Sequence, residues 1–447
     1  MKTAIIYKRK IYDQMVKWKR ERDGETALLI QGARRIGKST IVEDFAKREY
    51  KSYILIDFSK AKKEVMELFE DLSDINFNLM RLQIIFNTKL VERNSVIIFD
   101  EVQKQPLARQ AIKHLVADHR YDYIETGSLI SIKSNVKDII IPSEETRLDM
   151  FPMDFEEFRW ALGDTATIPL IKQLFDKRKP LGNATHRKLM RDFRLYMLVG
   201  GMPQAVSKYI ETNNMSMVDQ VKRDIIALYE DDMNKLDSRG KSKALFDAIP
   251  SQLSKNASRF KVSASLPNER PGRIATIIND MADSKTINIA YHSDDPNVGM
   301  ALTKDVERFK MYACDTGLFV TMAFRDKALT EESIYNKLLN DKLSTNLGYI
   351  YENVVAQMLR TAGNDLYYTT MKKDDNKGYY EVDFLISRGN KLWPIEVKSS
   401  GYKTHKSIDK FAQKYTNRTG TKVIIYTKDL FQKGDTLYLP VYMTMFL

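Results

Sequence analysis

Residues 26–40 read TALLIQGARRIGKST, in which an apolar run meets the pattern GxxxxGK[ST]. The run at 27–30 predicts a buried strand of a parallel sheet, and residues 40–50 predict a helix. Glycines at 32 and 37 let the backbone turn with its N–H groups pointing inward, where they can hold phosphate oxygens. The stretch therefore predicts a phosphate-binding loop between a strand and a helix.

This loop predicts a site for a nucleoside triphosphate with Mg²⁺. We expect Lys38 to reach the β- and γ-phosphates and the Ser39 hydroxyl to bind the Mg²⁺ that they carry. A glycine turn with a solvated lysine is the structural alternative. The residues expected to contact the nucleotide are Gly32, Ala33, Arg34, Arg35, Ile36, Gly37, Lys38, Ser39 and Thr40.

A second strand, at 95–101, reads SVIIFDE and ends in two carboxylates. We expect Asp100 to hold Mg²⁺ through its water shell and Glu101 to polarise the attacking water. A solvated strand end is the alternative. A glutamate next to the aspartate is typical of hydrolases whose sheet has an additional strand, and small GTPases position water by other means.

Residues 121–128, YDYIETGS, predict another strand of the same sheet. Thr126 or Ser128 at its end is a candidate sensor of the γ-phosphate, although either hydroxyl would serve as a helix cap. Arg147 is the basic residue nearest this strand. It is a candidate arginine finger, and an ion pair with Glu144 or Glu145 is its structural alternative.

The composition of the chain indicates a soluble globular protein. Its 447 residues suggest two or three domains, and 43% are hydrophobic and 29% charged. The net charge of +12 favours an acidic partner such as DNA, or reflects a lysine-rich, solvated surface. Cys314 is the only cysteine, no apolar run is long enough for a signal sequence or a membrane span, and the five histidines are scattered. We therefore expect a reducing, cytoplasmic location, no membrane and no zinc site.

The middle of the chain predicts helices between 185 and 230, interrupted at 200–203, and then the element order of a winged helix. Two helical segments after 249 precede β-rich runs at 286–292 and 309–314. Such a unit binds DNA or acts as a spacer. The positive charge for a DNA contact would come from Lys255, Arg259, Lys261, Arg270 and Arg273.

Residues 334–447 carry 17 Lys and Arg against 11 Asp and Glu, about half of the net charge. A predicted helix at 349–360 carries Glu352, and predicted strands at 379–387 and 392–399 carry Asp383 and then Glu396 with Lys398. Alternation along a strand puts Glu396 and Lys398 on one face. Asp383 and Glu396 would bind Mg²⁺, with Lys398 positioning water. A surface hairpin with a salt bridge is the alternative.

These motifs together resemble a family of bacterial and archaeal AAA-like P-loop ATPases with a C-terminal domain of unknown function that has a PD-(D/E)XK nuclease-like core. The resemblance covers nearly the whole chain, and the signature's Pro-Asp is here Val382-Asp383. The matching stretches are GARRIGKST, VIIFDEVQ, IETGS, FPMDFEEF, LVGGMPQAV, IPSQLSKNASRFKVS, FKMYACDTGLF, YEN, EVDFLI and IEVKS.

The resemblance implies an α/β fold in four parts. These are an AAA-like ATP-binding domain at 1–160 with a parallel sheet core, a helical lid or connector at 161–240, a winged-helix-like domain at 241–333 and an α/β restriction-endonuclease-like domain at 334–447. It also implies ATP as the nucleotide, and places Glu352, Asp383, Glu396 and Lys398 at the nuclease-like positions.

We therefore expect an enzyme that hydrolyses ATP with Mg²⁺ as a switch or motor, acting on or with nucleic acid. One alternative is a metal-dependent DNA nuclease gated by ATP. Another is a DNA- or protein-binding module with incidental turnover. A protein partner and an oligomer are both compatible with the sequence.

Overall fold

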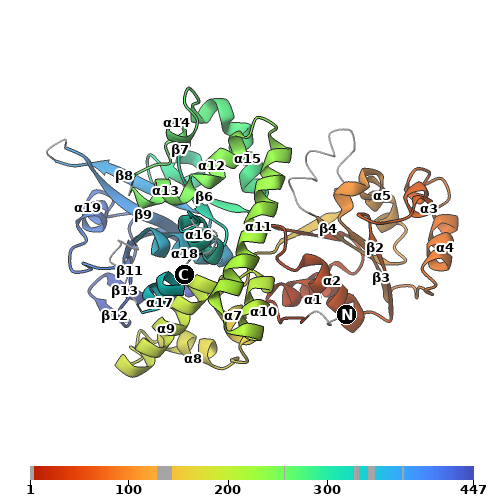
Figure 1. Ribbon diagram of the computed structural model, residues 1–447, viewed down its shortest axis with the longest axis horizontal. Helices are drawn as coiled ribbons and strands as arrows, with labels where there is room; N and C mark the ends of the chain where they lie inside the picture. Colours follow the sequence, from red (N-terminus) through yellow and green to blue (C-terminus); the bar gives the residue numbers. More distant parts are fainter. Residues whose placement is uncertain are drawn as a thin grey trace. The chain divides into compact units, whose positions relative to one another are not determined.

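The computed structural model describes residues 5–127, 143–255, 257–326, 330, 332–340, 348–374 and 377–447. The chain forms two compact units (Figure 1). The first comprises Met1–Phe151 with Asp283–Lys285, and the second comprises Pro152–Ala282 with Thr286–Leu447. The first predicted domain boundary, at residue 160, thus lies close to a boundary between compact units.

The first unit is built on a five-stranded parallel sheet with the strand order β2-β3-β4-β1-β5. β4 lies between the strand that precedes the glycine-rich loop, β1, and the strand that ends in Asp100, β3. This is the additional strand that the Asp-Glu pair predicts, and it confirms the α/β fold with a parallel sheet. The strands are β1 (Ala27–Gln31), β2 (Ser52–Asp57), β3 (Ser95–Asp100), β4 (Asp122–Gly127) and β5 (Glu145–Asp149).

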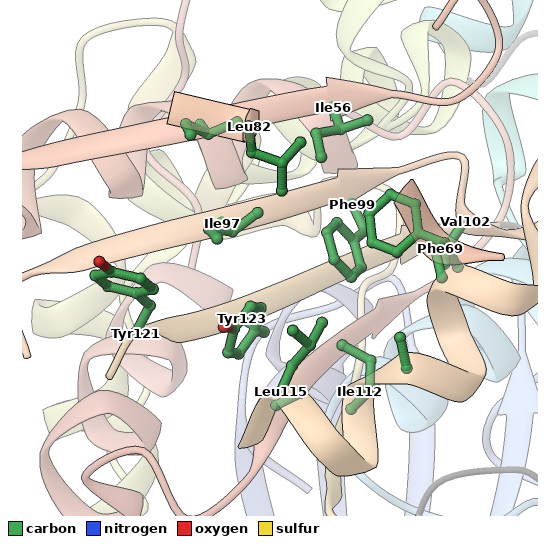
Figure 2. Close-up of a cluster of buried hydrophobic side chains, with 14 of the residues drawn as sticks. Ile56, Phe69, Leu82, Ile97, Phe99, Val102, Ile112, Leu115, Tyr121 and Tyr123 are labelled. Carbon is green, nitrogen blue, oxygen red and sulfur yellow. The ribbon is translucent and has the colours of Figure 1, made fainter. Parts of the chain in front are cut away.

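Helices cover both faces of this sheet, which explains why its central strands are continuous apolar runs. On one face, alternate residues of the strands pack against α3, α4 and α5 in a single core (Figure 2). Phe99 of β3 meets the ring of Phe69 edge-on there, with ring centroids 5.4 Å apart. The helices are α1 (Ile11–Arg22), α2 (Lys38–Glu49), α3 (Lys63–Met66), α4 (Ile75–Ile85) and α5 (Pro106–Ala117), with short 3-10 turns η1 (Glu67–Phe69) and η2 (Val102–Lys104).

The second unit contains the predicted helices, and the predicted break falls between α9 and α10. None of the described helices has both the length and the apolar character needed to cross a bilayer. The helices are α7 (Phe155–Ala161), α8 (Thr167–Asp176), α9 (Asn183–Val199), α10 (Pro203–Thr212), α11 (Met215–Leu236), α12 (Lys241–Asp247), α13 (Ile249–Ser254), α14 (Val262–Ser265), α15 (Ala275–Asp283), α16 (Thr316–Ala323), α17 (Glu332–Leu339), α18 (Gly348–Thr361) and α19 (Lys406–Lys414), with 3-10 turns η3 (Pro271–Ile274), η4 (Met300–Thr303) and η5 (Val441–Phe446).

The second unit also holds an eight-stranded mixed sheet with the order β12-β13-β11-β10-β9-β8-β6-β7. Its central strands, β9 and β10, form the antiparallel hairpin on which the predicted nuclease-like residues lie. The strands are β6 (Ile287–Ser293), β7 (Lys304–Ala313), β8 (Tyr367–Lys372), β9 (Tyr379–Arg388), β10 (Lys391–Lys398), β11 (Lys422–Tyr426), β12 (Phe431–Lys433) and β13 (Thr436–Pro440).

The strands that we expected in a winged-helix-like domain belong to this sheet. β6 and β7 pair antiparallel, and β6 also pairs in parallel with β8. The edge of β6 is thereby hydrogen-bonded rather than left open to another chain. The predicted boundary between residues 333 and 334 therefore does not separate two sheets.

Candidate functional site

The glycine-rich loop leaves β1 and enters α2 with the backbone turns that a phosphate cradle requires. Gly37 caps α2 with φ +96°, and Arg35 also has a positive φ, +66°. A Cβ on Gly32 would lie 2.3 Å from the carbonyl oxygen of Met150, so a side chain does not fit there. Left-handed residues within such a loop turn successive N–H groups toward one concave side. The loop thus has the geometry expected of an anion site at a helix start.

Lys38 lies on the first turn of α2 and is buried. Its ammonium group donates to the carbonyl oxygens of Gly32 and Ala33, each at 2.9 Å. The charged end of the side chain is therefore held within the loop itself. This is the position from which we expect it to meet phosphate.

The predicted Mg²⁺ ligands lie in contact. Ser39 Oγ donates to Asp100 Oδ1 at 2.8 Å, and the Thr126 hydroxyl donates to the same carboxylate oxygen. Asp100 and Thr126 are buried at the carboxyl ends of β3 and β4. Hydroxyl and carboxylate oxygens suit a hard cation such as Mg²⁺, so the residues present fit the predicted metal.

Glu101 follows β3 directly and has a left-handed backbone, with φ +56°. Its carboxylate accepts a hydrogen bond from the Gln103 side-chain amide. A left-handed conformation is uncommon for a residue with a side chain, and it turns Glu101 away from the path of the strand. The structure thus brings Lys38, Ser39, Asp100, Glu101 and Thr126 to one edge of the sheet, and Ser128 lies outside the described residues.

Two residues that support this site were not identified from the sequence. Arg9, just before α1, is buried, and its guanidinium donates to the carbonyl oxygens of Ile36 at 2.8 Å and Phe151 at 2.6 Å. Gln103 holds Glu101. Lysines and arginines around 8–22 suggest a solvated face, and no pattern separates Arg9 from them. Only the tertiary structure shows that it braces the loop.

Arg147 lies on β5 opposite Leu29 of β1. Its Nε donates to Glu145 Oε1 at 2.7 Å, which is the ion pair given above as the structural alternative. Glu145 also pairs with the buried Arg109, at 2.8 Å. In this chain Arg147 is therefore part of a charge cluster beside the sheet, and a role as an arginine finger stays a prediction.

Glu125 of β4 is fully buried beside Arg109 and Glu145. Burial raises the pKa of its carboxyl well above the usual range; Arg109 opposes this shift and Glu145 adds to it. A carboxyl with a raised folded pKa contributes stability below its unfolded pKa, and loses it as pH rises through the folded value.

We expect Glu125→Gln, which mimics the protonated carboxyl, to be at least as stable as wild type at pH 8 and to lose less stability between pH 5 and pH 8. Urea unfolding at both pH values measures this, with the exposed Glu70→Gln as the matched control. A loss of more than about 2 kcal/mol at pH 8 would show that the charged form is required instead.

The predicted nuclease-like residues make contacts with different parts of the sheet. Lys398 Nζ lies 2.7 Å from Glu396 Oε1 on β10, and Glu396 is buried. Asp383 of β9 accepts a hydrogen bond from the Val397 backbone N–H at 2.7 Å. Glu352 of α18 instead contacts residues of β7 that the sequence analysis did not identify.

Those residues are Lys310 and Tyr312. Lys310 is buried, its Nζ lies 2.9 Å from Glu352 Oε1, and it also pairs with Glu381. The Tyr312 hydroxyl donates to Glu352 Oε1 at 2.6 Å. Burial lowers the pKa of Lys310, but Glu352 and the other acidic groups outweigh it, so the pKa is raised and the lysine stays charged. Burial and Glu352 raise the pKa of Asp383.

Lys310 therefore brings a buried positive charge into contact with this acidic cluster. Among the described residues, one group of three His, Cys, Asp or Glu side chains has ligand atoms that all lie within 4.8 Å of one another. This group consists of His292, Asp294 and Asp305. His292 there pairs with Asp294 at 3.0 Å, and Arg308 pairs with the same carboxylate at 3.1 Å. Glu352, Asp383 and Glu396 do not form such a group of three, and the predicted Mg²⁺ site at Asp383 and Glu396 stays a prediction.

The parallel sheet, the loop and the residues at the strand ends together define a P-loop domain of the class that binds nucleotides. Residues 24–159 match the family model of the AAA domain. Residues 24–159 thus contain an AAA-like P-loop domain, as the resemblance implies. Residues 190–329 and 347–443 match two families described only as domains of unknown function, DUF8612 and DUF4143, and the nuclease-like fold stays a prediction.

No curated protein matches the chain. Among solved structures, it is similar to the Walker-type ATPase PABY2304 of Pyrococcus abyssi, at 13% identity over 71% of this chain and 96% of that chain, with a TM-score of 0.42. It is also similar to the signal transduction ATPase PH0952 of Pyrococcus horikoshii, which has a tetratricopeptide repeat sensor, at 12% identity over 80% of this chain and 49% of that chain, with a TM-score of 0.29. A third similar structure is Cdc6p from Pyrobaculum aerophilum, at 11% identity over 74% and 93% of the two chains, with a TM-score of 0.23. Likenesses of this size do not define a function.

Proposed function

We propose that the chain binds Mg-ATP and hydrolyses it as a switch or motor that acts on or with nucleic acid. One observation carries the ATPase part. The hydroxyls of Ser39 and Thr126 converge on the carboxylate of Asp100, with Glu101 as the next residue. A solvated strand end would need no such arrangement, whereas a site that holds Mg²⁺ and positions water for hydrolysis of a triphosphate can use each of these groups.

Each residue then has a distinct task. The loop amides and Lys38 bind the β- and γ-phosphates, and Ser39 and Asp100 would hold Mg²⁺, which would offset the charge of the phosphates. Glu101 accepts hydrogen bonds from the attacking water and orients it in line with the γ-phosphate. Thr126, through its bond to Asp100, responds to the loss of that phosphate.

The hydrolase proposal is tested by measuring binding and turnover separately on the purified chain. We expect Mg-ATP to bind and inorganic phosphate to be released, with both lost in Lys38→Ala. The exposed Lys51→Ala is the matched control, because it removes one ammonium group of the same unit away from the loop. Binding of ATP that is equal in wild type and Lys38→Ala would contradict the proposed site.

Thr126→Val tests the proposed sensor. Loss of a hydroxyl that donates to a carboxylate is worth about 1.5 kcal/mol, so we expect phosphate release to fall about tenfold while ATP affinity changes little. Thr126→Ser keeps the hydroxyl and is expected to keep most of the activity. Equal loss in both variants would indicate that the residue matters only for packing.

The nucleic-acid part of the proposal is supported by charge. The chain carries a net charge of +12, which favours a polyanionic partner. The same net charge is compatible with a protein partner or with an oligomer of the chain. The binding-module alternative differs in one result, because Glu101→Gln would then preserve the function of the protein, whereas a motor would lose it.

We do not favour the ATP-gated nuclease. Lys310 neutralises Glu352 and Glu381, and Lys398 neutralises Glu396. We infer that these ion pairs stabilise the sheet of the second unit. Cleavage of DNA in Mg²⁺ or Mn²⁺ that is lost in Asp383→Ala and Lys398→Ala would restore the nuclease alternative.

A further inference from the structure

An open cavity of about 700 Å³ lies in the second unit, between η3, the start of α14 and the first half of β7. Its lining contains four exposed basic side chains that are distant from the candidate ATP site in sequence. Arg259 and Lys261 come directly before α14, Arg270 comes directly before η3, and Arg273 lies within η3.

These four charges have no ion-pair partner within the described part of the chain, although acidic groups line the same cavity. Glu269 is paired with Lys241 at 2.6 Å, and Asp305 lies 4.0 Å from Arg308. Glu307 of β7 lies close to η3, where a Cβ on Gly272 would lie 2.6 Å from its Oε1. The cavity therefore presents an excess of positive charge to solvent.

Like charges that gather around one cavity repel one another unless an anion lies between them. Arginine and lysine donate to phosphate oxygens, and several such contacts in a row are typical of proteins that follow a nucleic-acid backbone. A cavity of this size is open enough for several phosphate groups and does not enclose a small ligand.

The aromatic residue in the cavity lining, Phe260, indicates that the cavity suits duplex rather than single-stranded nucleic acid. Phe260 is buried, and its ring stacks on Phe309 with ring centroids 6.0 Å apart. It does not offer a free face on which an unpaired base could stack, and such stacking is the usual basis of single-strand binding. A duplex keeps its bases stacked inside and presents only phosphates to the cavity.

We propose that this basic cavity binds the phosphate backbone of duplex DNA without reading its sequence. The inference rests on the nucleic-acid part of the proposed function and is independent of ATP hydrolysis. It predicts that affinity depends on salt rather than on base sequence.

Fluorescence anisotropy of the full chain with labelled random-sequence duplex DNA tests this proposal. Four phosphate contacts predict that affinity falls roughly a hundredfold between 50 and 200 mM salt. The variant with all four residues changed to glutamine is expected to lose most of the affinity and nearly all of the salt dependence. Each single change to glutamine should reduce the slope of log affinity against log salt by about one.

The matched control removes the same charge from exposed lysines of the same unit that do not line the cavity. It changes Lys403, Lys406, Lys428 and Lys433 to glutamine, and we expect it to bind DNA nearly as well as wild type. Equal loss of affinity in the control and the cavity variant would overturn the proposal, because general charge would then explain binding. Tighter binding of single-stranded DNA, duplex RNA or polyglutamate than of duplex DNA would also overturn it.

Two further measurements separate this inference from the ATPase proposal. We expect Lys38→Ala to bind duplex DNA like wild type, and the cavity variant to unfold at the wild-type temperature and to keep its DNA-independent phosphate release. A DNA-binding loss in Lys38→Ala that matches the loss in the cavity variant would place DNA binding under nucleotide control and overturn the proposal as stated.

Discussion

Glu101→Gln is expected to bind Mg-ATP like wild type and to hydrolyse it at least about a hundredfold more slowly. The substitution keeps the size of the side chain and removes its negative charge, so the amide can no longer polarise the attacking water. The hydrogen bond from Gln103 fixes the side-chain end in wild type, and a glutamine oxygen can accept it equally well. Binding should therefore survive while turnover is lost.

Single-turnover phosphate release and equilibrium ATP binding, measured on the same preparation, check this expectation. Glu70→Gln, an exposed residue of the first unit, is the matched control for the loss of one carboxylate. An equal fall in binding and in turnover would instead show that Glu101 acts in holding the loop.

Lys310→Met is expected to lower the free energy of unfolding by about 3 kcal/mol, because it leaves two partly buried carboxylates without their cation. Lys310 is 5% exposed, and its partners Glu352 and Glu381 are 14% and 24% exposed, so little solvent screens the pairs. Urea unfolding followed by circular dichroism measures the effect. The exposed Lys403→Met is the control for the loss of one ammonium group.

The double variant Lys310→Met with Glu352→Gln separates the loss of charge balance from the loss of packing. We expect it to recover part of the stability, since the amide oxygen can still accept the hydrogen bond from Tyr312. Two results would contradict the view that Lys310 takes the place of a metal. One is that Lys310→Met unfolds with the same free energy as wild type. The other is that Mn²⁺ stabilises the nucleotide-free wild type and that Asp383→Asn abolishes this effect.

The sequence predicted the first unit well because its signals are local. Strands β1 and β3 are continuous apolar runs that end in a loop motif and in Asp-Glu, and parallel strands bring those ends to one edge. Ser39, Asp100 and Thr126 meet there as expected. Arg9 could not be found in this way, because its partners are carbonyl groups far along the chain.

The second unit was harder to predict because its contacts are long-range. The strands that carry Asp383 and Glu396 were correctly placed, yet the partner of Glu352 comes from β7, which we assigned to another domain. Nothing in the local pattern of β6 and β7 indicates that β6 pairs with β8. Lys310 lies on β7, which the sequence indicated only as a β-rich run near β6. It was therefore not predicted as part of the acidic site.

The proposed hydrolysis of ATP is best tested by measuring phosphate release from Mg-ATP. The proteins compared are wild type, Lys38→Ala and Glu101→Gln, each with and without duplex DNA. We expect turnover by wild type that depends on both residues and rises with DNA. Turnover by wild type no higher than that of Glu101→Gln under every condition would contradict the hydrolase and leave a nucleotide-dependent binding module in its place.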